Sequence, residues 1–181
     1  MQIYSPEEDS YLLSEVIKKK QNLQGKKILD MGSGSGIQTE TAISQGANPK
    51  NITLVDINPD SIRLLKKKFP NSQVIQSDLF AKIKDEKFDY IFFNPPYLPQ
   101  DKDNLEPKDS QRATTGGKHG SEVINRFLTQ AKSHLNTEGK ILILISNLTK
   151  KIDWKNYKKE KLMEKKLFFE VLEVWELRSI N

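Results

Sequence analysis

The chain has 181 residues, a length typical of one domain with a sizeable core. Cysteine is absent and only two histidines occur, which argues against disulfides, thiol chemistry and a zinc site. The formal net charge is +5, with lysines clustered near 18–20, 66–68 and 150–166; such clusters are solvated helix faces or contacts to nucleic acid or an acidic partner. We find neither a membrane-spanning apolar run nor a secretory signal, so the cytoplasm is the expected compartment.

The first half of the chain alternates between helix and strand patterns. Pro6 and the two acidic residues after it favour the start of a helix, which we expect from about Glu7 to Lys19 or Lys20. Short apolar runs bounded by polar or glycine-containing turns predict strands, with helices between them. The elements expected next are a strand at Lys27 to Met31, a helix at Ile37 to Ser44, a strand at Asn51 to Asp56, a helix at Pro59 to Phe69 and a strand at Ser72 to Gln76.

The second half begins with a buried strand predicted at Phe88 to Phe93. Residues 94–119 then form a long polar loop, which we interpret as the substrate loop because loops of this length are often active-site lids or binding loops. The remaining elements expected are a helix at Ser121 to Leu135, a strand at Ile141 to Ile145, and two antiparallel strands joined at Lys166 to Glu170, the second being Val171 to Ile180. Trp175 in that last strand is expected to pack rather than to bind substrate.

These elements predict an α/β fold in a single domain over residues 1–181. The expected architecture is a seven-stranded, mainly parallel sheet with a C-terminal antiparallel hairpin and helices on both faces. Because ligands of open α/β sheets bind at the carboxyl ends of the strands, candidate functional residues are those that follow each predicted strand.

The most informative stretch follows the strand at Phe88 to Phe93 and reads Asn94-Pro95-Pro96-Tyr97. Two consecutive prolines cannot continue a sheet ladder or enter a helix, so the backbone leaves the sheet in a fixed, extended shape. An amide side chain, a proline carbonyl and an aromatic ring thereby come together at a strand end. Such a group can accept two hydrogen bonds from a planar –NH2 group, which helps a weakly nucleophilic amide or aromatic amine nitrogen to react.

A glycine-rich turn follows the first predicted strand. Gly32, Gly34 and Gly36 alternate behind the carboxylate of Asp30, which lets the backbone approach a ligand closely. A dinucleotide-binding fingerprint would need a glycine where Ile37 stands, and no Lys-Ser/Thr pair closes a phosphate-binding loop. A carboxylate beside the turn suits a cationic ligand better than a pyrophosphate.

Two more carboxylates stand near predicted strand ends. Asp56 lies 22 residues after Gly34, where it can bridge the two hydroxyls of a ribose, and Asp78 can accept a hydrogen bond from an adenine amine. Each acid alone is more often a turn residue or a helix cap. Together with the glycine turn, however, they describe a ligand with an adenine, a ribose and a positive centre, and S-adenosylmethionine fits this description.

The order of these motifs resembles that of the Rossmann-like, class I S-adenosylmethionine-dependent methyltransferases. Three stretches carry a narrower resemblance, namely Tyr4-Ser5-Pro6-Glu7-Glu8-Asp9-Ser10-Tyr11-Leu12-Leu13, Asn94-Pro95-Pro96-Tyr97-Leu98-Pro99 and Thr115-Gly116-Gly117-Lys118-His119-Gly120-Ser121-Glu122-Val123-Ile124. In these stretches the chain is similar to the HemK-type protein-glutamine N5-methyltransferases, in the archaeal and eukaryotic branch that modifies class-one release factors. The resemblance covers nearly the whole chain, is faintest from Thr149 to Lys166, and includes no counterpart of the extra N-terminal helical domain of bacterial HemK-type enzymes.

This resemblance implies S-adenosyl-L-methionine as the cofactor, lying across the ends of the first three strands and capped by the N-terminal helix. The implied cofactor-binding residues are Ser10, Asp30, Gly32, Gly34, Asp56, Asp78, Leu79 and Asn94. The implied catalytic residues are Asn94, Pro95, Pro96 and Tyr97, and no metal is expected. The target –NH2 group would donate to the Asn94 side-chain oxygen and the Pro95 carbonyl, while Tyr97 packs on the flat amide.

The resemblance also implies a substrate and a partner. The substrate would be the glutamine of the Gly-Gly-Gln motif in a translation release factor. The partner would be a small zinc-binding activator protein that pairs with an exposed sheet edge, for which the third strand is a candidate.

An adenine or guanine amino-methyltransferase acting on RNA or DNA stays open as an alternative function, because these bases also present a planar –NH2 group. Contact with RNA or the ribosome would fit the pI of about 9.2, although no separate target-recognition domain is evident. A non-enzymatic binding protein would be expected to have lost Asp30, Asp56 or Asn94, and all three are present.

Overall fold

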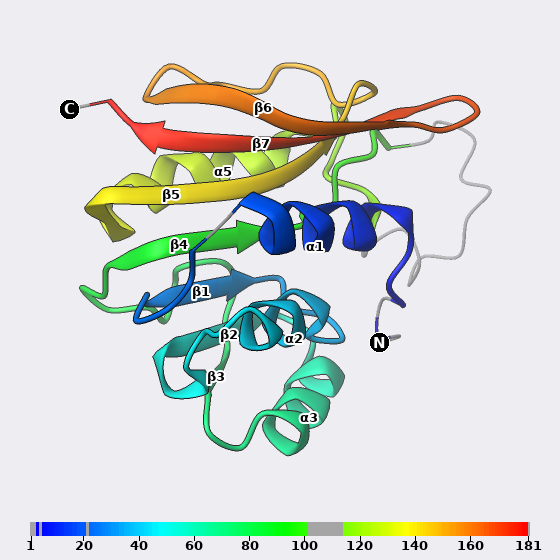
Figure 1. Cartoon of the computed structure of the whole chain (residues 1–181). Helices are drawn as coiled ribbons and strands as arrows, with labels where there is room; N and C mark the ends of the chain where they lie inside the picture. Colours follow the sequence, from blue (N-terminus) through cyan, green and yellow to red (C-terminus); the bar gives the residue numbers. More distant parts are fainter. Residues whose placement is uncertain (1–2, 4, 21, 101–113, 181) are drawn as a thin grey trace.

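The computed structural model describes residues 3, 5–20, 22–100 and 114–180. Its centre is a seven-stranded sheet in the order β3-β2-β1-β4-β5-β7-β6 (Figure 1). The pairs from β3 through β5 are parallel, and β7 runs antiparallel to both β5 and β6, so the predicted mainly parallel sheet with a C-terminal hairpin is confirmed. The strands are β1 (Ile28–Met31), β2 (Ile52–Asp56), β3 (Gln73–Gln76), β4 (Phe88–Phe93), β5 (Leu135–Ser146), β6 (Tyr157–Lys166) and β7 (Val171–Ser179).

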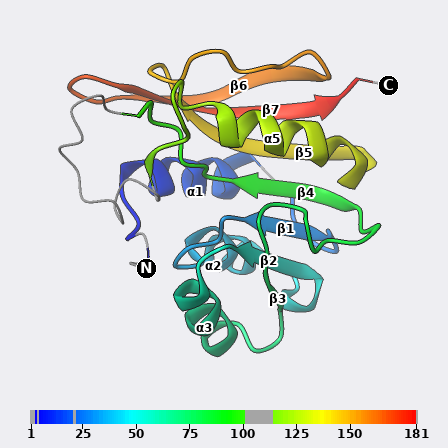
Figure 2. The same cartoon turned by 180° about the vertical axis from the view of Figure 1, so that it is seen from behind.

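Helices cover both faces of the sheet, as predicted (Figures 1 and 2). Helices α1, α2 and α3 contribute to the buried cluster on one face, and α5 contributes to the cluster on the other. Asn58 caps α3 by accepting a hydrogen bond from the Asp60 N–H at 2.9 Å, and Pro59 opens the helix with its preset φ. The helices are α1 (Glu8–Lys20), α2 (Ile37–Ser44), α3 (Pro59–Lys68) and α5 (Glu122–Ala131), with short 3₁₀ turns η1 (Pro49–Asn51) and η2 (Lys132–His134).

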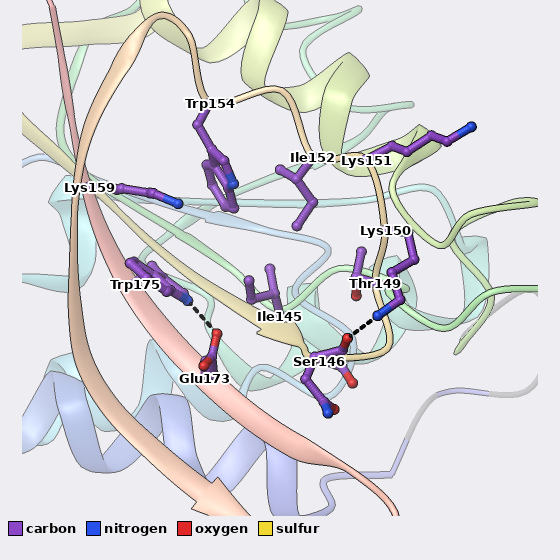
Figure 3. Close-up of a pocket in the computed structure, with 11 residues that line it drawn as sticks. Ile145, Ser146, Thr149, Lys150, Lys151, Ile152, Trp154, Lys159, Glu173 and Trp175 are labelled. Atoms are coloured by element: carbon purple, nitrogen blue, oxygen red, sulfur yellow. Dashed lines mark hydrogen bonds between the residues drawn. The ribbon is translucent and has the colours of Figure 1, made fainter.

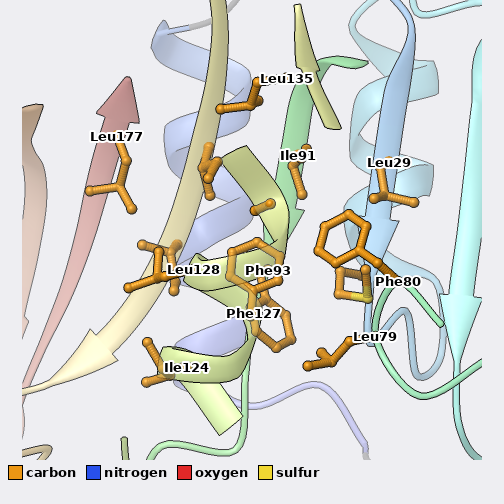
Figure 4. Packing of buried hydrophobic residues seen from close by; sticks show 14 of the residues in the cluster. Leu29, Leu79, Phe80, Ile91, Phe93, Ile124, Phe127, Leu128, Leu135 and Leu177 are labelled. Atoms are coloured by element: carbon orange, nitrogen blue, oxygen red, sulfur yellow. The ribbon is translucent and has the colours of Figure 1, made fainter. Parts of the chain in front are cut away.

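The central strands are buried on both sides, so alternate residues feed two separate cores. In β4, Ile91 and Phe93 face α5, whereas Phe92 faces the side of α1 and α2. Figure 4 shows Phe127 of α5 packed on the face of the sheet that Ile91 and Phe93 line. The ring centroids of Phe127 and Phe93 lie 4.4 Å apart. Burying a side chain of this kind contributes about 1.5–3 kcal/mol, so packing on both faces stabilises the central strands of the sheet.

The predicted boundary between the helix at Ser121 to Leu135 and the next strand is wrong. Helix α5 ends at Ala131, and β5 already begins at Leu135, opposite Phe88. The first half of β5 is partly exposed and polar, with a register shift against β4 between Phe88 and Tyr90, so it lacks the continuous apolar signal of Ile141 to Ile145.

Residues 101–113 of the predicted substrate loop, and Tyr4 of the N-terminal motif, lie outside the described residues. Within the described part of the chain, no helix is long and apolar enough to cross a membrane.

Candidate active site

The predicted site residues converge on one edge of the sheet because their strands end at the same level. Met31 is in register with Val55 on β2 and with Phe93 on β4. The residues that follow these three positions are the glycine turn, Asp56 and Asn94, so all of them lie at the carboxyl edge of the parallel strands, where open α/β sheets bind ligands.

The glycine turn after β1 is held to the end of β2 by Asp56. One carboxylate oxygen of Asp56 accepts from the Gly34 N–H at 2.7 Å, and the other accepts from the Asn58 N–H at 2.7 Å. Burial raises the pKa of Asp56, although these main-chain donors oppose the shift. Asp56 therefore shapes the turn while keeping lone pairs for a further donor.

The turn itself requires glycine at Gly36. Its φ of +83° is unfavourable for other residues, and a Cβ at this position would lie 2.4 Å from the Phe69 ring. Gly32 and Gly34 also have positive φ values, of +63° and +53°, but the space beside them is more open. The backbone therefore packs against the protein at Gly36 and leaves room for a ligand at the other two glycines.

Asp30 lies below the turn and is only 2% exposed. Its Oδ2 accepts from the Thr39 N–H at 3.1 Å and from the Thr39 hydroxyl at 2.7 Å, which ties β1 to α2. Burial raises the pKa of Asp30 to about 7, and the charge of Asp56 adds to the shift, while the Thr39 donors oppose it. A cation placed over the turn would favour the ionised form of this carboxyl group.

Asn94 is connected to the N-terminal helix. Its Nδ2 group donates to Asp9 Oδ2 at 3.2 Å and to Ser10 Oγ at 3.3 Å. Its Oδ1 atom is buried and has no hydrogen-bond partner among the described residues. Buried polar atoms are almost always paired, so an unpaired carbonyl oxygen held in a fixed direction is ready to accept from an N–H donor that is not part of the chain.

Tyr97 lies in the same loop and is partly buried against both cores. Burial raises the pKa of Tyr97, and the negative charges of Asp9, Glu170 and Glu7 raise it further. Its backbone carbonyl accepts from the Thr149 hydroxyl at 2.9 Å, which fixes the loop to the segment after β5.

A second glycine-containing segment, residues 114–120, packs directly on this loop. A parallel bridge joins Leu98 to Thr115, and the Gly116 N–H donates to the Leu98 carbonyl at 3.0 Å. A Cβ at Gly116 would lie 2.4 Å from the Pro96 carbonyl oxygen, and one at Gly120 would lie 2.2 Å from the Tyr97 carbonyl oxygen. The glycines at positions 116 and 120 therefore allow this segment to pack closely against Asn94-Pro95-Pro96-Tyr97.

The predicted adenine-binding residues follow β3. Asp78 is half exposed and forms an ion pair with Arg126 of α5 at 2.7 Å. Leu79 adopts a φ of +48°, a conformation that costs a non-glycine residue roughly 1–3 kcal/mol and is typical of functional sites. Ile57, directly after Asp56, is 59% exposed and offers an apolar surface at the same edge of the sheet.

A separate cavity of about 310 Å³ contains none of the predicted site residues. It lies beside the end of β5, between the segment 147–154 and β6–β7 (Figure 3). The Lys159 ammonium group is 5.1 Å from the Trp154 ring centroid and 4.8 Å from that of Trp175, so the chain itself covers both rings. Trp175 therefore packs, as its position in the sequence predicts.

Sequence reasoning missed several residues that the structure brings to this edge. Asp9 was part of a motif, but its contact with Asn94 joins residues 85 positions apart. Arg126 lies on the exposed side of α5, and Glu170 lies at a hairpin turn, so neither carries a local signal. Ile57 could have been found, because an apolar residue just beyond a strand end is outside the core pattern.

Comparisons with known proteins identify the family of the chain. Residues 6–108, more than half of the chain, match the family described as methyltransferase small domain. The chain is 37% identical over 152 residues to a Methanocaldococcus jannaschii protein provisionally named protein N5-glutamine methyltransferase, a match that covers 82% of this chain and 74% of the relative. It is 29% identical over 156 residues to the release factor glutamine methyltransferase of Rhodopirellula baltica, covering 78% of this chain but only 52% of that longer relative.

A solved structure has the same fold. It is the E. cuniculi Mtq2-Trm112 complex responsible for the methylation of the eRF1 translation termination factor. The similarity has a TM-score of 0.75 at 24% identity and covers 99% of this chain and 100% of the other. At this identity the comparison establishes the Rossmann-like methyltransferase fold, and the sequence matches establish the family. The chain belongs to the methyltransferase small domain family and, within it, to the HemK-type protein-glutamine N5-methyltransferases.

Proposed function

We propose that the protein methylates the side-chain amide nitrogen of a glutamine in a translation release factor, with S-adenosyl-L-methionine as methyl donor. The observation that carries this proposal is the side-chain oxygen Oδ1 of Asn94, just after β4. This oxygen is buried and has no hydrogen-bond partner among the described residues. The names of the Rhodopirellula relative and of the E. cuniculi complex support a release factor as substrate. A release factor as substrate would place the reaction in the cytoplasm.

The residues along the carboxyl edge suit this cofactor. When bound, S-adenosylmethionine supplies a methyl group on a positively charged sulfur. Asp56 would accept from the ribose hydroxyls, and Asp78 with Leu79 would border the adenine beside the exposed face of Ile57. Gly32 and Gly34 leave backbone space for the amino-acid portion, with Asp30 providing negative charge below it and Ser10 reaching its carboxylate.

The loop at residues 94–97, which we call the catalytic loop, would act by positioning the amide. Asn94 Oδ1 and the Pro95 carbonyl accept two hydrogen bonds from the target –NH2 group, which orients its nitrogen and favours a pyramidal, nucleophilic geometry. Pro96 fixes the extended backbone, and the Tyr97 ring packs on the flat amide. No general base is needed, because the nitrogen becomes acidic on methylation and loses its proton to water afterwards. Positioning therefore supplies most of the rate acceleration.

We further propose that a small zinc-binding activator protein pairs with β3. This strand is an edge of the sheet, and its Val74 and Ile75 side chains are only partly buried. An exposed, uncharged edge strand can accept an additional strand from a partner. The E. cuniculi structure is a complex of two named chains, which supports an enzyme made of two proteins. That the partner binds zinc is part of our proposal.

The proposal is tested with tritiated S-adenosylmethionine. The protein is incubated with purified archaeal release factor, total tRNA, ribosomal RNA or DNA, and a parallel set contains the activator protein. We expect label in the release factor and none after its Gly-Gly-Gln glutamine is replaced by alanine.

The rival substrate is an adenine or guanine amine in nucleic acid, which the lysine clusters could attract electrostatically. Label in RNA or DNA alone, with the release factor unlabelled even beside the activator, would overturn the glutamine assignment. That outcome would leave the methyltransferase chemistry in place, since both substrates present a planar –NH2 group to Asn94.

A further inference from the structure

The turn between β6 and β7, residues 167–170, lies at the same edge of the sheet as the candidate active site. Leu172 near the start of β7 pairs with Ser146 at the carboxyl end of β5. In both overall views the turn extends beyond the rest of the sheet at this edge, on the side of the molecule where α1 begins (Figures 1 and 2). We call residues 167–170 the hairpin tip.

The hairpin tip is firmly held. The Asn147 N–H donates to the Val171 carbonyl at 3.0 Å, and the Val171 N–H donates to Asn147 Oδ1 at 2.9 Å. Within the turn, the Leu167 N–H donates to the Glu170 carbonyl at 2.7 Å. Lys165, just before the tip, forms an ion pair with Glu8 of α1. The tip is therefore fixed both to the end of β5 and to the N-terminal helix that contacts Asn94.

Glu170 in this tip carries a second unpaired polar atom. Its Oε1 is buried and has no hydrogen-bond partner among the described residues. Among these residues, Asn94 Oδ1 is the only other buried side-chain nitrogen or oxygen atom without a partner. The Glu170 charge also reaches the Tyr97 hydroxyl, together with the charges of Asp9 and Glu7. A buried carboxylate oxygen without a donor destabilises the fold, so a donor from outside the chain is its natural partner.

The two residues at the apex of the tip are Phe168 and Phe169. Their side chains are 97% and 89% exposed, and their ring centroids lie 5.7 Å apart. Neither has a positive φ, and tight turns favour glycine, asparagine, aspartate or proline, so turn geometry does not account for two phenylalanines here. Exposed aromatic pairs of this kind are typical of surfaces that bind another protein.

We propose that the hairpin tip positions the substrate protein. In this assignment Glu170 accepts a hydrogen bond from an N–H donor of the substrate chain beside the target amide, and Phe168 and Phe169 pack on an apolar surface of the same protein. This inference rests on the proposed function, because it requires a protein substrate rather than a nucleic-acid base. It adds an element that is distant in sequence from the motifs at positions 94–97 and 115–120.

The first experiment compares Glu170→Leu, which removes both acceptor oxygens at similar volume, with Glu170→Gln, which keeps one acceptor. For Glu170→Leu we expect at least about a tenfold fall in kcat/KM with release factor, an unchanged Kd for S-adenosylmethionine, and a Tm that is unchanged or higher. Glu170→Gln should recover part of the rate. Glu164→Leu, on an exposed acid of the same hairpin, is the matched control and should retain wild-type kcat/KM.

A merely structural role of Glu170 predicts the opposite pattern. A lower Tm for Glu170→Leu, or an unchanged kcat/KM, would overturn the assignment of Glu170. The Tm measurement needs no substrate, so it judges this inference even if the wild-type protein fails to label any release factor, which is the separate failure of the proposed function.

The second experiment changes the apex. The double variant Phe168→Ser with Phe169→Ser should raise KM for intact release factor at least about fivefold. KM for a short Gly-Gly-Gln peptide and the Kd for S-adenosylmethionine should stay unchanged, because only the intact protein reaches the two phenylalanines at the apex. Equal KM values for wild type and variant with intact release factor would overturn the docking role of the two phenylalanines.

Discussion

At the scale of single residues, Asn94 and Glu170 share an unusual property, because each keeps a buried side-chain oxygen without a partner among the described residues. Such atoms lower the stability of the folded chain and persist where a ligand completes their hydrogen bonds. The Asn94 amide is held on its other side by Asp9 and Ser10, so its free oxygen has a defined direction. This arrangement is the basis of the catalytic role that we propose for Asn94.

Asn94→Ala should therefore abolish methyl transfer without weakening cofactor binding. We expect kcat to fall by at least about 100-fold, because the variant loses an acceptor that acts on the reacting nitrogen, and the Kd for S-adenosylmethionine to change by less than about twofold. Rates are measured with labelled cofactor and Kd by calorimetry. Asn136→Ala is a suitable control, since Asn136 bonds to Asp89 at the opposite end of β4. Parallel losses of rate and cofactor affinity would show that Asn94 belongs mainly to the cofactor site.

Asp30 gives a prediction about pH. Its pKa is raised by burial from 3.8 to about 7, so between these values the folded protein binds a proton that the unfolded chain has released. The free energy of unfolding of the cofactor-free protein should fall as pH rises through this window, by on the order of 4 kcal/mol, and the burial of Asp56 acts in the same direction. In Asp30→Asn, denaturant unfolding at pH 5 and pH 7.5 should show a smaller difference than in wild type. An identical pH dependence in both proteins would mean that Asp30 is already ionised in the folded state.

At the scale of elements, the two loops that meet at the active site form one packed unit. Gly116 has no positive φ, so its requirement for glycine is purely steric, and the nearest backbone oxygen would lie only 2.1 Å from an added Cβ. The methyl group of an alanine would have to displace either residues 114–120 or residues 94–97.

Gly116→Ala should therefore lower both stability and activity. We expect the free energy of unfolding to fall by about 1–3 kcal/mol. We also expect the rate of methyl transfer to fall by a larger fraction than the free energy of unfolding, because the added methyl group displaces Pro96 and its neighbours. Gly25→Ala is the comparison: its Cβ meets nothing within 4 Å, and only its φ of +71° opposes the substitution. If both variants kept full activity, the packing of these two loops would be irrelevant to catalysis.

The elements themselves were largely predictable from sequence. Helix α2 has the predicted limits of Ile37 and Ser44, because glycines stand on both sides of it. Strand β4 has the predicted limits of Phe88 and Phe93, because its apolar run ends just before two prolines. The start of β5 was missed for the opposite reason, since its polar, half-exposed residues from Leu135 onward carry no strand pattern.

The site was predictable only in part. Residues 30–36, 56, 78 and 94–97 each lie at or just beyond the carboxyl end of a strand, so the rule that ligands bind at strand ends brings them together. Contacts made across the fold, such as Asp78 with Arg126 or the charge of Glu170 near Tyr97, join segments 48 or more positions apart and leave no local trace. Such contacts need the packed core that sets their distances.

At the scale of the whole molecule, the two edges of the sheet differ in character. Strand β6 forms one edge and carries lysines at many of its exposed positions, which discourages pairing with another strand. Strand β3 forms the other edge and reads Gln-Val-Ile-Gln, with no charge. If a partner adds a strand to this sheet, β3 is the edge that allows it.

A proline at Gln76 should test this edge. The Ser77 N–H donates to the Asp56 carbonyl on β2, so by strand alternation the Gln76 N–H points away from β2, toward a partner strand. Gln76→Pro removes that donor at an exposed edge position where proline is tolerated, so we expect a nearly unchanged Tm but a loss of about 1 kcal/mol or more in binding to the activator, measured by calorimetry. Gln76→Ala loses the same side-chain contact with the Ile57 carbonyl but keeps the N–H, and it should bind like wild type. Equal binding by the proline and alanine variants would mean that the activator does not extend the sheet at β3.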